Sequence, residues 1–260
     1  MSAIENSGVV WITGASTGIG RGLALSFAAD GFKVAASARS ADKLHELEAI
    51  SPNIKAYPLD VTDASAALAC VNAIENRSGA IGLAVLNAGI WHPMTAARFD
   101  LDKAKESLDV NYTGVLNTLA PVMRPMIERG RGHIALVSSV AGYRGLPKSA
   151  AYAPTKAALI SLAESLYIDL KLKGVTITVI NPGFIATPMT AVNTFPMPFI
   201  VSQDDAVKAI RAGLKRGSFE IVFPGRMALL MKMLRVLPYR LYFWATANAL
   251  ERETPPTDGA

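Results

Sequence analysis

The sequence predicts an α/β fold in which a mostly parallel sheet is covered by helices on both faces. Short β-branched segments alternate with longer helical patterns along most of the 260 residues. A glycine-rich stretch, TGASTGIG at 13–20, joins the first of these segments to the first helical pattern. Because no linker rich in Pro, Gly or Ser divides the chain, we expect one domain over residues 1–250.

Seven segments have the length and composition of buried strands. They cover residues 9–13, 33–38, 54–59, 83–87, 133–138, 175–180 and 219–223. The helical patterns cover residues 18–30, 40–50, 63–76, 101–129, 150–173 and 203–216, with Ser40 and Asp63 as candidate N-caps. Residues 251–260, ERETPPTDGA, predict a flexible tail.

The composition is that of a folded globular chain. Hydrophobic residues make up 51% and charged residues 18%, which is enough apolar material for a buried core. The net charge of +5 is compatible with nucleic-acid binding, but no run of Lys or Arg exceeds two residues. A basic cofactor pocket explains the charge as well, and we expect no nucleic-acid partner.

The chain carries the features of a cytoplasmic protein. Its single cysteine, Cys70, has no partner for an internal disulfide, and the apolar run at 9–13 is too short for a signal sequence. The longest charge-free stretch, 174–203, contains four prolines and would make a poor membrane-spanning helix. The three histidines are scattered without ligand spacing, so we expect no metal site.

The glycine-rich stretch has the properties of a phosphate-binding turn. It places glycines in a G-x-x-x-G-x-G pattern between a strand and a helix, where the backbone turns sharply and approaches a ligand closely. The alternative is a purely structural turn, which has less reason to carry three glycines. The residues expected to hold a pyrophosphate are Gly14, Ser16, Thr17, Gly18, Ile19 and Gly20.

The end of the second predicted strand indicates which dinucleotide binds. An acidic residue about 20 positions beyond the glycines usually binds the ribose hydroxyls, whereas an arginine there suits a 2′-phosphate. Here Ala38 occupies the acidic position and Arg39 follows it. This arrangement predicts NADP(H) in preference to NAD(H); the alternative is that Arg39 is a surface charge and that an acid comes from elsewhere.

Tyr152 and Lys156 lie four positions apart in an alanine-rich stretch that predicts a helix. Residues i and i+4 share one helix face, so the phenol and the ammonium belong to one site. A nearby positive charge lowers the pKa of a tyrosine, which predicts a phenol that gives up its proton near neutral pH. The alternative is an ordinary half-buried aromatic residue beside a solvated lysine.

Six motifs together resemble the short-chain dehydrogenase/reductase family over residues 9 to about 225: TGASTGIG at 13–20, LNAG at 86–89, DVNYTG at 109–114, LVSS at 136–139, YAPTK at 152–156 and NPGFIAT at 181–187. The resemblance implies a single Rossmann-type, doubly wound domain with a seven-stranded parallel sheet. It also implies an NAD(P)-dependent enzyme acting on CH–OH and C=O groups, usually as a homodimer or homotetramer. The family's catalytic tetrad falls on Asn111, Ser139, Tyr152 and Lys156.

Each member of this tetrad also has a chemical reason. Reducing a carbonyl needs a proton donor at the oxygen, for which Tyr152 is suited, and a hydroxyl at the sheet edge that can hydrogen-bond the same oxygen. Neighbours on a strand point to opposite faces, so only one of Ser138 and Ser139 enters the cleft, and the family's spacing to the tyrosine selects Ser139. Lys156 would bind the nicotinamide ribose as well, and Asn111 would hold a water. The alternative for Asn111 is a helix-interior side chain bonded to backbone.

The resemblance also implies further cofactor contacts. Asp60 and Val61 would contact the adenine, and the residues after the fourth strand would lie under the ribose. The loop after the sixth strand would cover the nicotinamide. These two groups are Asn87, Ala88 and Gly89, and Pro182, Gly183, Ile185 and Thr187.

The substrate side is expected to be apolar. Three segments, IWHPM, VAGYRGL and FPMPFI, supply side chains with few groups suited to a sugar or a phosphate. The residues expected to line this cleft are Trp91, Met94, Tyr143, Phe184, Phe195, Met197 and Phe199. A hydrophobic ketone or aldehyde is therefore the expected substrate.

The segment 226–250 combines basic residues with strongly apolar runs and predicts a C-terminal helical region. We expect it to pack against the pocket or a partner subunit. Peripheral contact with a membrane is the alternative.

These observations predict an NADPH-dependent carbonyl reductase working on an apolar substrate. One alternative is an NAD(P)-dependent dehydrogenase of alcohols, hydroxysteroids or lipids that works in the oxidative direction. Another is a catalytically idle cofactor-binding or interaction protein on the same fold.

Overall fold

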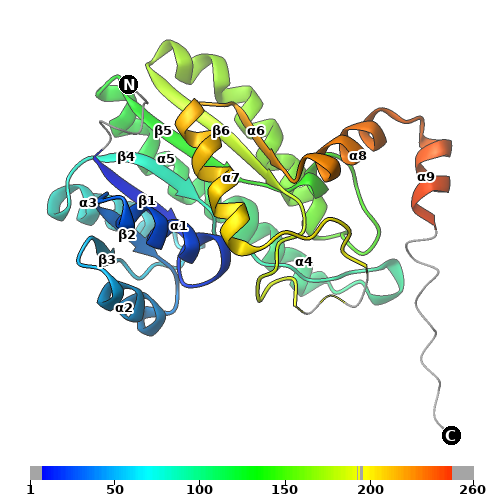
Figure 1. Cartoon of the computed structure of the whole chain (residues 1–260), viewed down its shortest axis with the longest axis horizontal. Helices are drawn as coiled ribbons and strands as arrows, with labels where there is room; N and C mark the ends of the chain where they lie inside the picture. Colours follow the sequence, from blue (N-terminus) through cyan, green and yellow to red (C-terminus); the bar gives the residue numbers. More distant parts are fainter. Residues whose placement is uncertain (1–7, 192, 194–195, 248–260) are drawn as a thin grey trace, which may run out of the picture.

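Seven parallel strands form one sheet in the order β3-β2-β1-β4-β5-β6-β7 (Figure 1). The structure is a computed structural model that describes residues 8–191, 193 and 196–247. The strands are β1 (Val9–Thr13), β2 (Val34–Ser37), β3 (Ile54–Ala56), β4 (Ile81–Leu86), β5 (Gly132–Val137), β6 (Val175–Pro182) and β7 (Glu220–Phe223). The predicted α/β class and seven-stranded parallel sheet are confirmed.

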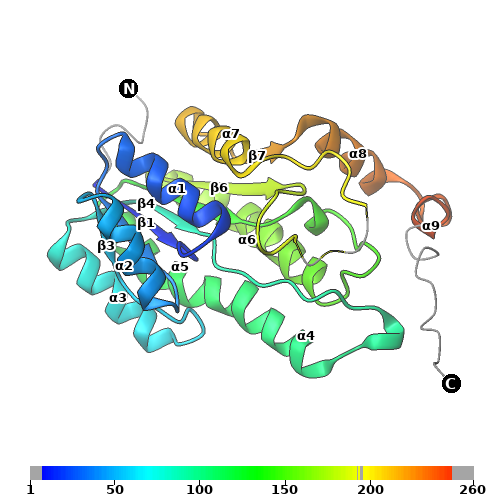
Figure 2. The ribbon, with the colours of Figure 1, turned by 60° about the horizontal axis from the view of Figure 1, so that its bottom comes forward.

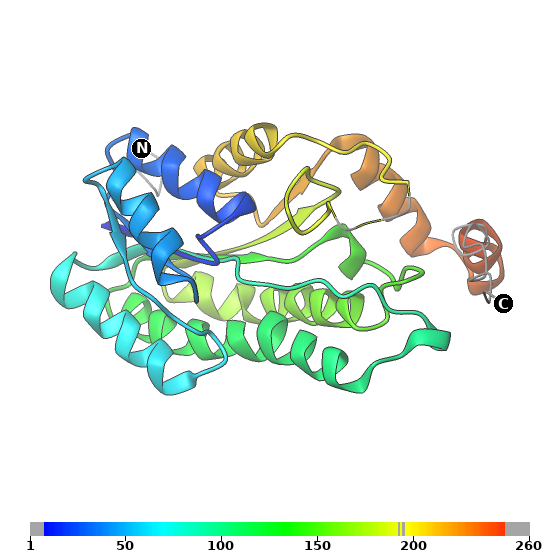
Figure 3. The same ribbon diagram turned by 90° about the horizontal axis from the view of Figure 1, so that it is seen from below.

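Helices cover both faces of the sheet (Figures 2 and 3). One face carries α1 (Gly18–Ala29), α2 (Ala41–Ile50) and α7 (Gln203–Arg216). The other carries α3 (Ala64–Arg77), α5 (Gly114–Glu128) and α6 (Tyr152–Leu172), with α4 (Leu101–Leu108) continuing into α5 through a π-helical turn, Asp109–Thr113. Two further helices, α8 (Gly225–Val236) and α9 (Tyr239–Ala247), follow β7.

The core lies in two layers because successive side chains of a strand point to opposite faces. In β1, Val9 and Trp11 belong to the layer under α3, α5 and α6, while Val10 and Ile12 belong to the layer under α1 and α7. All four are essentially inaccessible to solvent. Such continuous apolar strands are typical of a parallel sheet that is covered on both sides.

The strand order places the binding crevice. The chain leaves β1 toward β2 on one side and later returns to β4 on the other, so β1 and β4 flank the point where the order reverses. Loops after these two strands diverge and leave a crevice at the carboxyl edge of the sheet, where open α/β sheets bind ligands.

Two predicted elements and one predicted helix cap differ from the structure. The strand expected at 54–59 ends at Ala56 because Pro58 lacks the N–H needed to continue the ladder, although Tyr57 and Leu59 still donate to β2 and the residue after it. The single helix expected over 101–129 is interrupted by the π-helical turn. Of the candidate caps, Asp63 accepts from the amide of Ala66, whereas Ser40 makes no side-chain cap bond.

The C-terminal helical segment predicted over 226–250 consists of two helices. The chain is extended at Leu237 and Pro238 follows, and a proline at this point cannot continue the hydrogen-bond pattern of α8. Residues 248–250 and the predicted tail at 251–260 lie outside the described residues. None of the helices in the described part of the chain is long and apolar enough to cross a membrane.

Candidate active site

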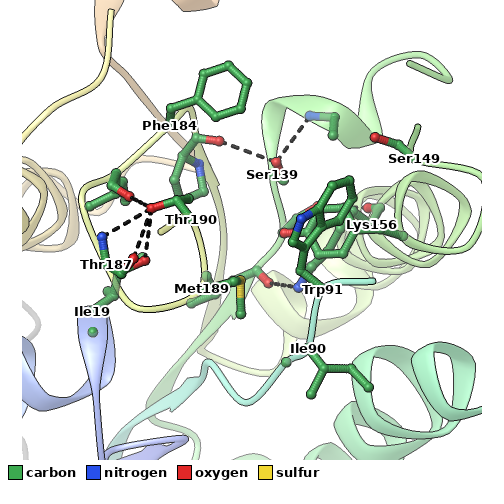
Figure 4. Close-up of a pocket in the computed structure, with 18 of the residues that line it drawn as sticks. Ile19, Ile90, Trp91, Ser139, Ser149, Lys156, Phe184, Thr187, Met189 and Thr190 are labelled. Carbon is green, nitrogen blue, oxygen red and sulfur yellow. Dashed lines mark hydrogen bonds between the residues drawn. The ribbon is translucent and has the colours of Figure 1, made fainter. Parts of the chain in front are cut away.

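A cavity of about 1550 Å³ opens at the carboxyl edge of the sheet (Figure 4). Its walls come mainly from the loops after β1 to β6, from the start of α6, and from α8. Of the four predicted catalytic residues, Ser139, Tyr152 and Lys156 line it and Asn111 lies behind it. The elements meet here because each strand ends at this edge of the sheet.

The glycine loop forms one end of the cavity. Gly14 has a φ of +67°, which L side chains rarely adopt, and an added Cβ at Gly20 would lie 2.3 Å from the carbonyl oxygen of Gly14. Gly20 therefore lets α1 approach the loop and does not line the cavity, unlike the other residues predicted to hold a pyrophosphate: Gly14, Ser16, Thr17, Gly18 and Ile19.

The first turn of α1 presents its amides at the same end. Thr17 is the N-cap residue of α1, but its hydroxyl accepts no hydrogen bond from the first amides of this helix. Free amides at a helix N-terminus bind phosphate well. The loop thus fits the pyrophosphate of a dinucleotide, as its glycine spacing predicts.

Asn87 ties the glycine loop to β4. Its side-chain amide donates to the carbonyl oxygens of Thr13 at 3.0 Å and Gly14 at 3.3 Å, while the Thr13 hydroxyl accepts from the amides of Asn87 and Ala88. Asn87, Ala88 and Gly89 all line the cavity, as expected. The Asn87 side chain is thus occupied with the loop backbone, which makes it a residue that shapes the cradle.

Arg39, Asp60 and Val61 line the wall beyond the glycine loop. Hydrogen bonds from the backbone and hydroxyl of Thr62 hold the pKa of Asp60 below its usual value, against the effect of burial, and the nearby Arg39 charge acts in the same direction. The carboxylate therefore stays ionised next to a cation. Ala38 also lines the cavity, so no carboxylate follows β2 directly.

Ser138 and Ser139 point in different directions, as alternation at a strand end predicts. The hydroxyl of Ser138 donates to the carbonyl oxygen of Lys156 at 2.7 Å and is buried against α6. That of Ser139 donates to Pro182 O at 3.4 Å and accepts from the amide of Ala141 at 3.1 Å (Figure 4). Ser139 therefore remains the serine with a hydroxyl at the cavity.

Lys156 is buried within the site, 3% exposed. Its ammonium donates to the carbonyl oxygen of Val137 at 2.9 Å and lies 5.4 Å from the ring centroid of Tyr152. Burial lowers the pKa of Lys156 to about 8. The two side chains do share one site, which excludes a solvated lysine.

The predicted acidification of Tyr152 is wrong. Burial raises the pKa of Tyr152 to about 12, and the neighbouring Ser139 hydroxyl offsets only part of this effect. The physical reason is that burial removes water from the phenol and so disfavours the charged phenolate more than the Ser139 hydroxyl favours it. Tyr152 is a neutral phenol that keeps its proton.

Asn111 is fully buried in the π-helical turn and is not part of the cavity wall. Its side-chain oxygen accepts from the amide of Ile90 at 2.7 Å, and its side-chain nitrogen donates to the carbonyl of Ile90 at 3.0 Å and to the hydroxyl of Thr155 at 3.3 Å. It bonds backbone, although not that of its own helix. Asn111 therefore holds the segment after β4 against α6.

The loop after β6 closes the cavity on the side of α7. Pro182, Gly183, Ile185 and Thr187 line it, as predicted. The Thr190 hydroxyl accepts from the amide of Thr187 at 3.1 Å and donates to the carbonyl of Ile185, which folds the loop back on itself (Figure 4).

Two of the residues predicted to line the apolar cleft do so. Trp91 packs edge-on against Tyr152 with ring centroids 5.0 Å apart, and Phe184 lies opposite Ser139 (Figure 4). The prediction is wrong for Met94, which is buried in the protein, and for Met197 and Phe199, which do not reach the cavity. It is also wrong for Tyr143, whose hydroxyl turns away to bond Glu220 on β7. Phe195 lies outside the described residues.

Helix α8 contributes a wall of the cavity, although the sequence analysis named none of its side chains among the lining residues. Four apolar side chains of this helix line the cavity at spacings of three or four residues, which is the pattern of one helix face. They are Met227, Leu230, Met231 and Leu234. The segment therefore packs on the pocket, which was one of the arrangements expected, and its apolar spacing was the signal available. No group of three His, Cys, Asp or Glu side chains within the described ranges has the geometry of a metal site.

Comparisons with known proteins agree with this fold. The short chain dehydrogenase family model matches residues 8–195. An uncharacterized oxidoreductase of Myxococcus xanthus is 41% identical over 235 residues, which cover 89% of this chain and 93% of that protein. The 3-oxoacyl-(acyl-carrier-protein) reductase of Escherichia coli is 33% identical over 183 residues, or 70% of this chain and 75% of that protein.

Solved structures show the same fold. A short chain dehydrogenase from Burkholderia cenocepacia in complex with NADP is 25% identical, with a TM-score of 0.81, covering 98% of this chain and 100% of that chain. The predicted resemblance is confirmed: the chain belongs to the short-chain dehydrogenase/reductase family of NAD(P)-dependent oxidoreductases.

Proposed function

We propose that the protein is an NADPH-dependent reductase of apolar ketones or aldehydes. The observation that carries the proposal is that Ser139, Tyr152 and Lys156 line the same cavity as the glycine loop and Arg39. A proton donor, a hydroxyl that can bind a carbonyl oxygen and a dinucleotide cradle thus occur in one continuous space.

The cradle favours NADPH over NADH. Arg39 lies at the wall of the cavity, and Ala38 stands where a carboxylate would repel a 2′-phosphate. Oδ1 of the neighbouring Asp60 accepts hydrogen bonds from the backbone amide and the hydroxyl of Thr62. When bound, the reduced nicotinamide supplies the hydride that the carbonyl carbon accepts.

The residues of this chain supply the proton and bind the carbonyl oxygen of the substrate. Tyr152 holds its proton because its pKa is raised, and it gives the proton up only when negative charge develops on a bound oxygen. The hydroxyl of Ser139 is placed to hydrogen-bond the same oxygen. Lys156, with a pKa lowered to about 8, can restore a proton to the phenol near neutral pH.

The substrate side of the cavity supports an apolar carbonyl compound. Trp91, Phe184 and the four side chains of α8 provide a largely apolar wall. The relative from Escherichia coli is by name a reductase of a 3-oxo compound, which supports the reductive direction. We further propose a cytoplasmic homodimer or homotetramer, because members of this family are typically oligomeric.

Replacing Tyr152 with Phe tests the proposal. The variant removes one oxygen atom and should lower turnover of accepted carbonyls by about 10²-fold or more, since it deletes the general acid. Oxidation of NADPH is followed spectrophotometrically with a panel of apolar ketones and aldehydes. Tyr167→Phe, on the same helix but packed against Phe219, is the matched control and should keep its activity.

Two outcomes would contradict the proposal. Undiminished turnover in Tyr152→Phe would remove the phenol from the chemistry. Absence of turnover in the wild-type protein across the whole panel, with NADPH bound, would favour a catalytically idle cofactor-binding protein.

A further inference from the structure

The outward face of α8 and α9 concentrates exposed apolar side chains. Within the described residues, eighteen large hydrophobic side chains are exposed, and eight of them lie in these two short helices. We call this set the C-terminal apolar face: Leu229, Leu230, Met233, Val236, Tyr239, Leu241, Phe243 and Trp244. Exposed apolar side chains gathered at this density on two neighbouring helices are typical of an interaction site.

The face lies at the end of the molecule away from β2 and β3. There α9 projects beyond the body of the domain, and α8 connects it to β7 (Figures 1 and 3). Trp244 is 79% exposed and belongs to this projecting helix. A surface that projects in this way can contact a broad, flat partner without a clash from the rest of the chain.

Helix α8 is apolar on two opposite sides. Met227 and Met231 are buried and line the cavity, whereas Leu229, Met233 and Val236 follow an i, i+4, i+7 spacing on the exposed side. Packing on the pocket explains only the first side. The exposed side requires a partner of its own.

The charge around the face has one sign. Between residues 221 and 247 the chain has four cationic side chains and no Asp or Glu. Lys232 pairs with Glu220, while Arg226, Arg235 and Arg240 are exposed. The face is therefore apolar and aromatic with a cationic border, which complements an anionic surface with an apolar interior.

Contacts of Arg144 hold α8 and α9 in place. Its guanidinium donates to the carbonyl oxygens of Leu234 at 2.7 Å and Leu237 at 2.6 Å, where α8 ends. It also lies 4.0 Å from the ring centroid of Tyr242, the buried aromatic residue of α9. The face is thus formed before any partner binds, which lowers the entropic cost of docking.

We propose that the C-terminal apolar face docks on the surface of an anionic lipid bilayer. Apolar and aromatic side chains would enter the boundary between headgroups and acyl chains, and the arginines would contact anionic headgroups. A second copy of the chain is a poorer occupant. A symmetric contact of this face with itself would bring cations against cations, with no acidic side chain of the segment to pair with them.

The same docking would present the cavity to the bilayer. Leu230 belongs to both surfaces, since it lines the cavity and is 40% exposed on the outward face. An apolar substrate dissolved in the bilayer would then reach the cavity along α8. This consequence for the substrate rests on the proposed function, whereas the docking itself does not.

Co-sedimentation of the full-length protein with vesicles tests the docking. The vesicles are phosphatidylcholine alone, or equal parts of phosphatidylcholine and phosphatidylglycerol. We expect binding to the anionic vesicles only, weakened by salt, and about a fivefold loss of partitioning for each of Arg226→Gln and Arg240→Gln. Lys33→Gln, an exposed charge before β2, is the matched control and should bind like the wild type.

The apolar part of the face is tested by the double variant Leu229→Ser/Trp244→Ser. It should lose partitioning on the order of tenfold or more, whereas Leu172→Ser, at a leucine near the end of α6 that is 79% exposed, should not. Circular dichroism verifies that the variants fold. In the wild type, vesicles should shift the fluorescence of Trp244 to shorter wavelength, because Trp11 is buried and Trp91 lies in the cavity.

Three results would overturn the proposal. The first is no binding of the wild-type protein to either vesicle. The second is equal binding to both vesicles, or an equal loss in Leu172→Ser. The third is a lower oligomeric mass of Leu229→Ser/Trp244→Ser without any vesicle binding by the wild type, which would make a second copy the occupant. None of these measurements requires catalytic turnover, so failure of the docking and failure of the carbonyl reductase proposal remain distinguishable.

Discussion

Asn111 holds both backbone polar groups of Ile90, accepting from its amide at 2.7 Å and donating to its carbonyl at 3.0 Å. This clasp crosses from the π-helical turn to the segment that follows β4. An added Cβ at Gly89 would lie 3.2 Å from the Asn111 oxygen and 3.5 Å from the Lys156 ammonium. The clasp therefore sets the spacing between the cavity wall and the buried lysine.

Replacing Asn111 with Ala should cost about 1–3 kcal/mol of unfolding free energy, because it leaves the amide and carbonyl of Ile90 without partners. It should also lower kcat more than nucleotide affinity, since the cavity wall shifts beside Lys156. Urea unfolding and steady-state kinetics measure the two effects. Asn117→Ala, which removes bonds to the carbonyls of Val61 and Thr62 instead, is the control and should leave kcat close to the wild-type value.

Replacing Arg39 with Ala should weaken NADPH binding by about 10–100-fold, because it removes a charge-assisted contact to a 2′-phosphate. NADH affinity should change little. Fluorescence titration with both nucleotides measures the effect, and Lys43→Ala on α2 controls for the change in net charge. An equal loss for NADPH and NADH would contradict the assigned role of Arg39.

Lys156 should give the stability of the protein a measurable pH dependence. Its pKa falls from 10.5 to about 8 in the folded state, so between these values the unfolded chain binds more protons and stability rises with pH. The gain is on the order of 3 kcal/mol, since the side chain is almost fully buried. Relative to Lys156→Met, the wild type should therefore become more stable from pH 8 toward pH 10.5 in urea unfolding. A stability difference between the two proteins that does not change with pH would contradict this assignment.

Glu220 should be important although it lies outside the cavity. It accepts from the hydroxyl of Tyr143, from Asn181 at 2.9 Å and from Lys232, and so ties the segment after Ser139 to β6 and α8. Burial raises the pKa of Glu220, but these hydrogen bonds outweigh it and leave the pKa below the usual value.

Glu220→Ala should destabilise the fold by about 2–4 kcal/mol, because it strands two buried donors. The loss should shrink as pH falls below 4.5, because the unfolded chain takes up a proton at this carboxyl there, and the ionic contribution of Glu220 is lost as pH falls further through its lowered folded pKa. Thermal unfolding at neutral and acidic pH measures this dependence. Glu164→Ala, an exposed carboxylate on α6, should have little effect at either pH.

The sequence predicts the sheet and the position of the glycine loop at the sheet edge well because both follow local rules. Local sequence patterns are enough to identify the apolar strands, the glycine loop and Arg39 after β2. Motif spacing likewise selects Ser139 over Ser138, and the hydroxyl of Ser138 is indeed bonded to the carbonyl of Lys156.

Other features depend on contacts between distant segments, so local sequence patterns do not predict them. Tyr143 follows Ser139 closely in the sequence, yet its hydroxyl bonds Glu220 and points away from the cavity. The pKa of Tyr152 depends on burial by the whole site, which outweighs its charged neighbour one turn away. Asn111 in the π-helical turn bonds the backbone of Ile90, a residue twenty-one positions earlier, and its own sequence context does not reveal that partner.

The position of Arg144 has a consequence for how this enzyme can diverge. Arg144 follows Ser139 by five residues. Its guanidinium donates hydrogen bonds to three carbonyl oxygens at the C-terminal end of α8, those of Leu234, Arg235 and Leu237. The part of the cavity wall that α8 forms is therefore held in place by the segment after β5 that contains Ser139 and Arg144. In a relative without this arginine, the last two helices could take a different orientation. Its cavity could then admit ligands of a different length while Ser139, Tyr152 and Lys156 stay unchanged.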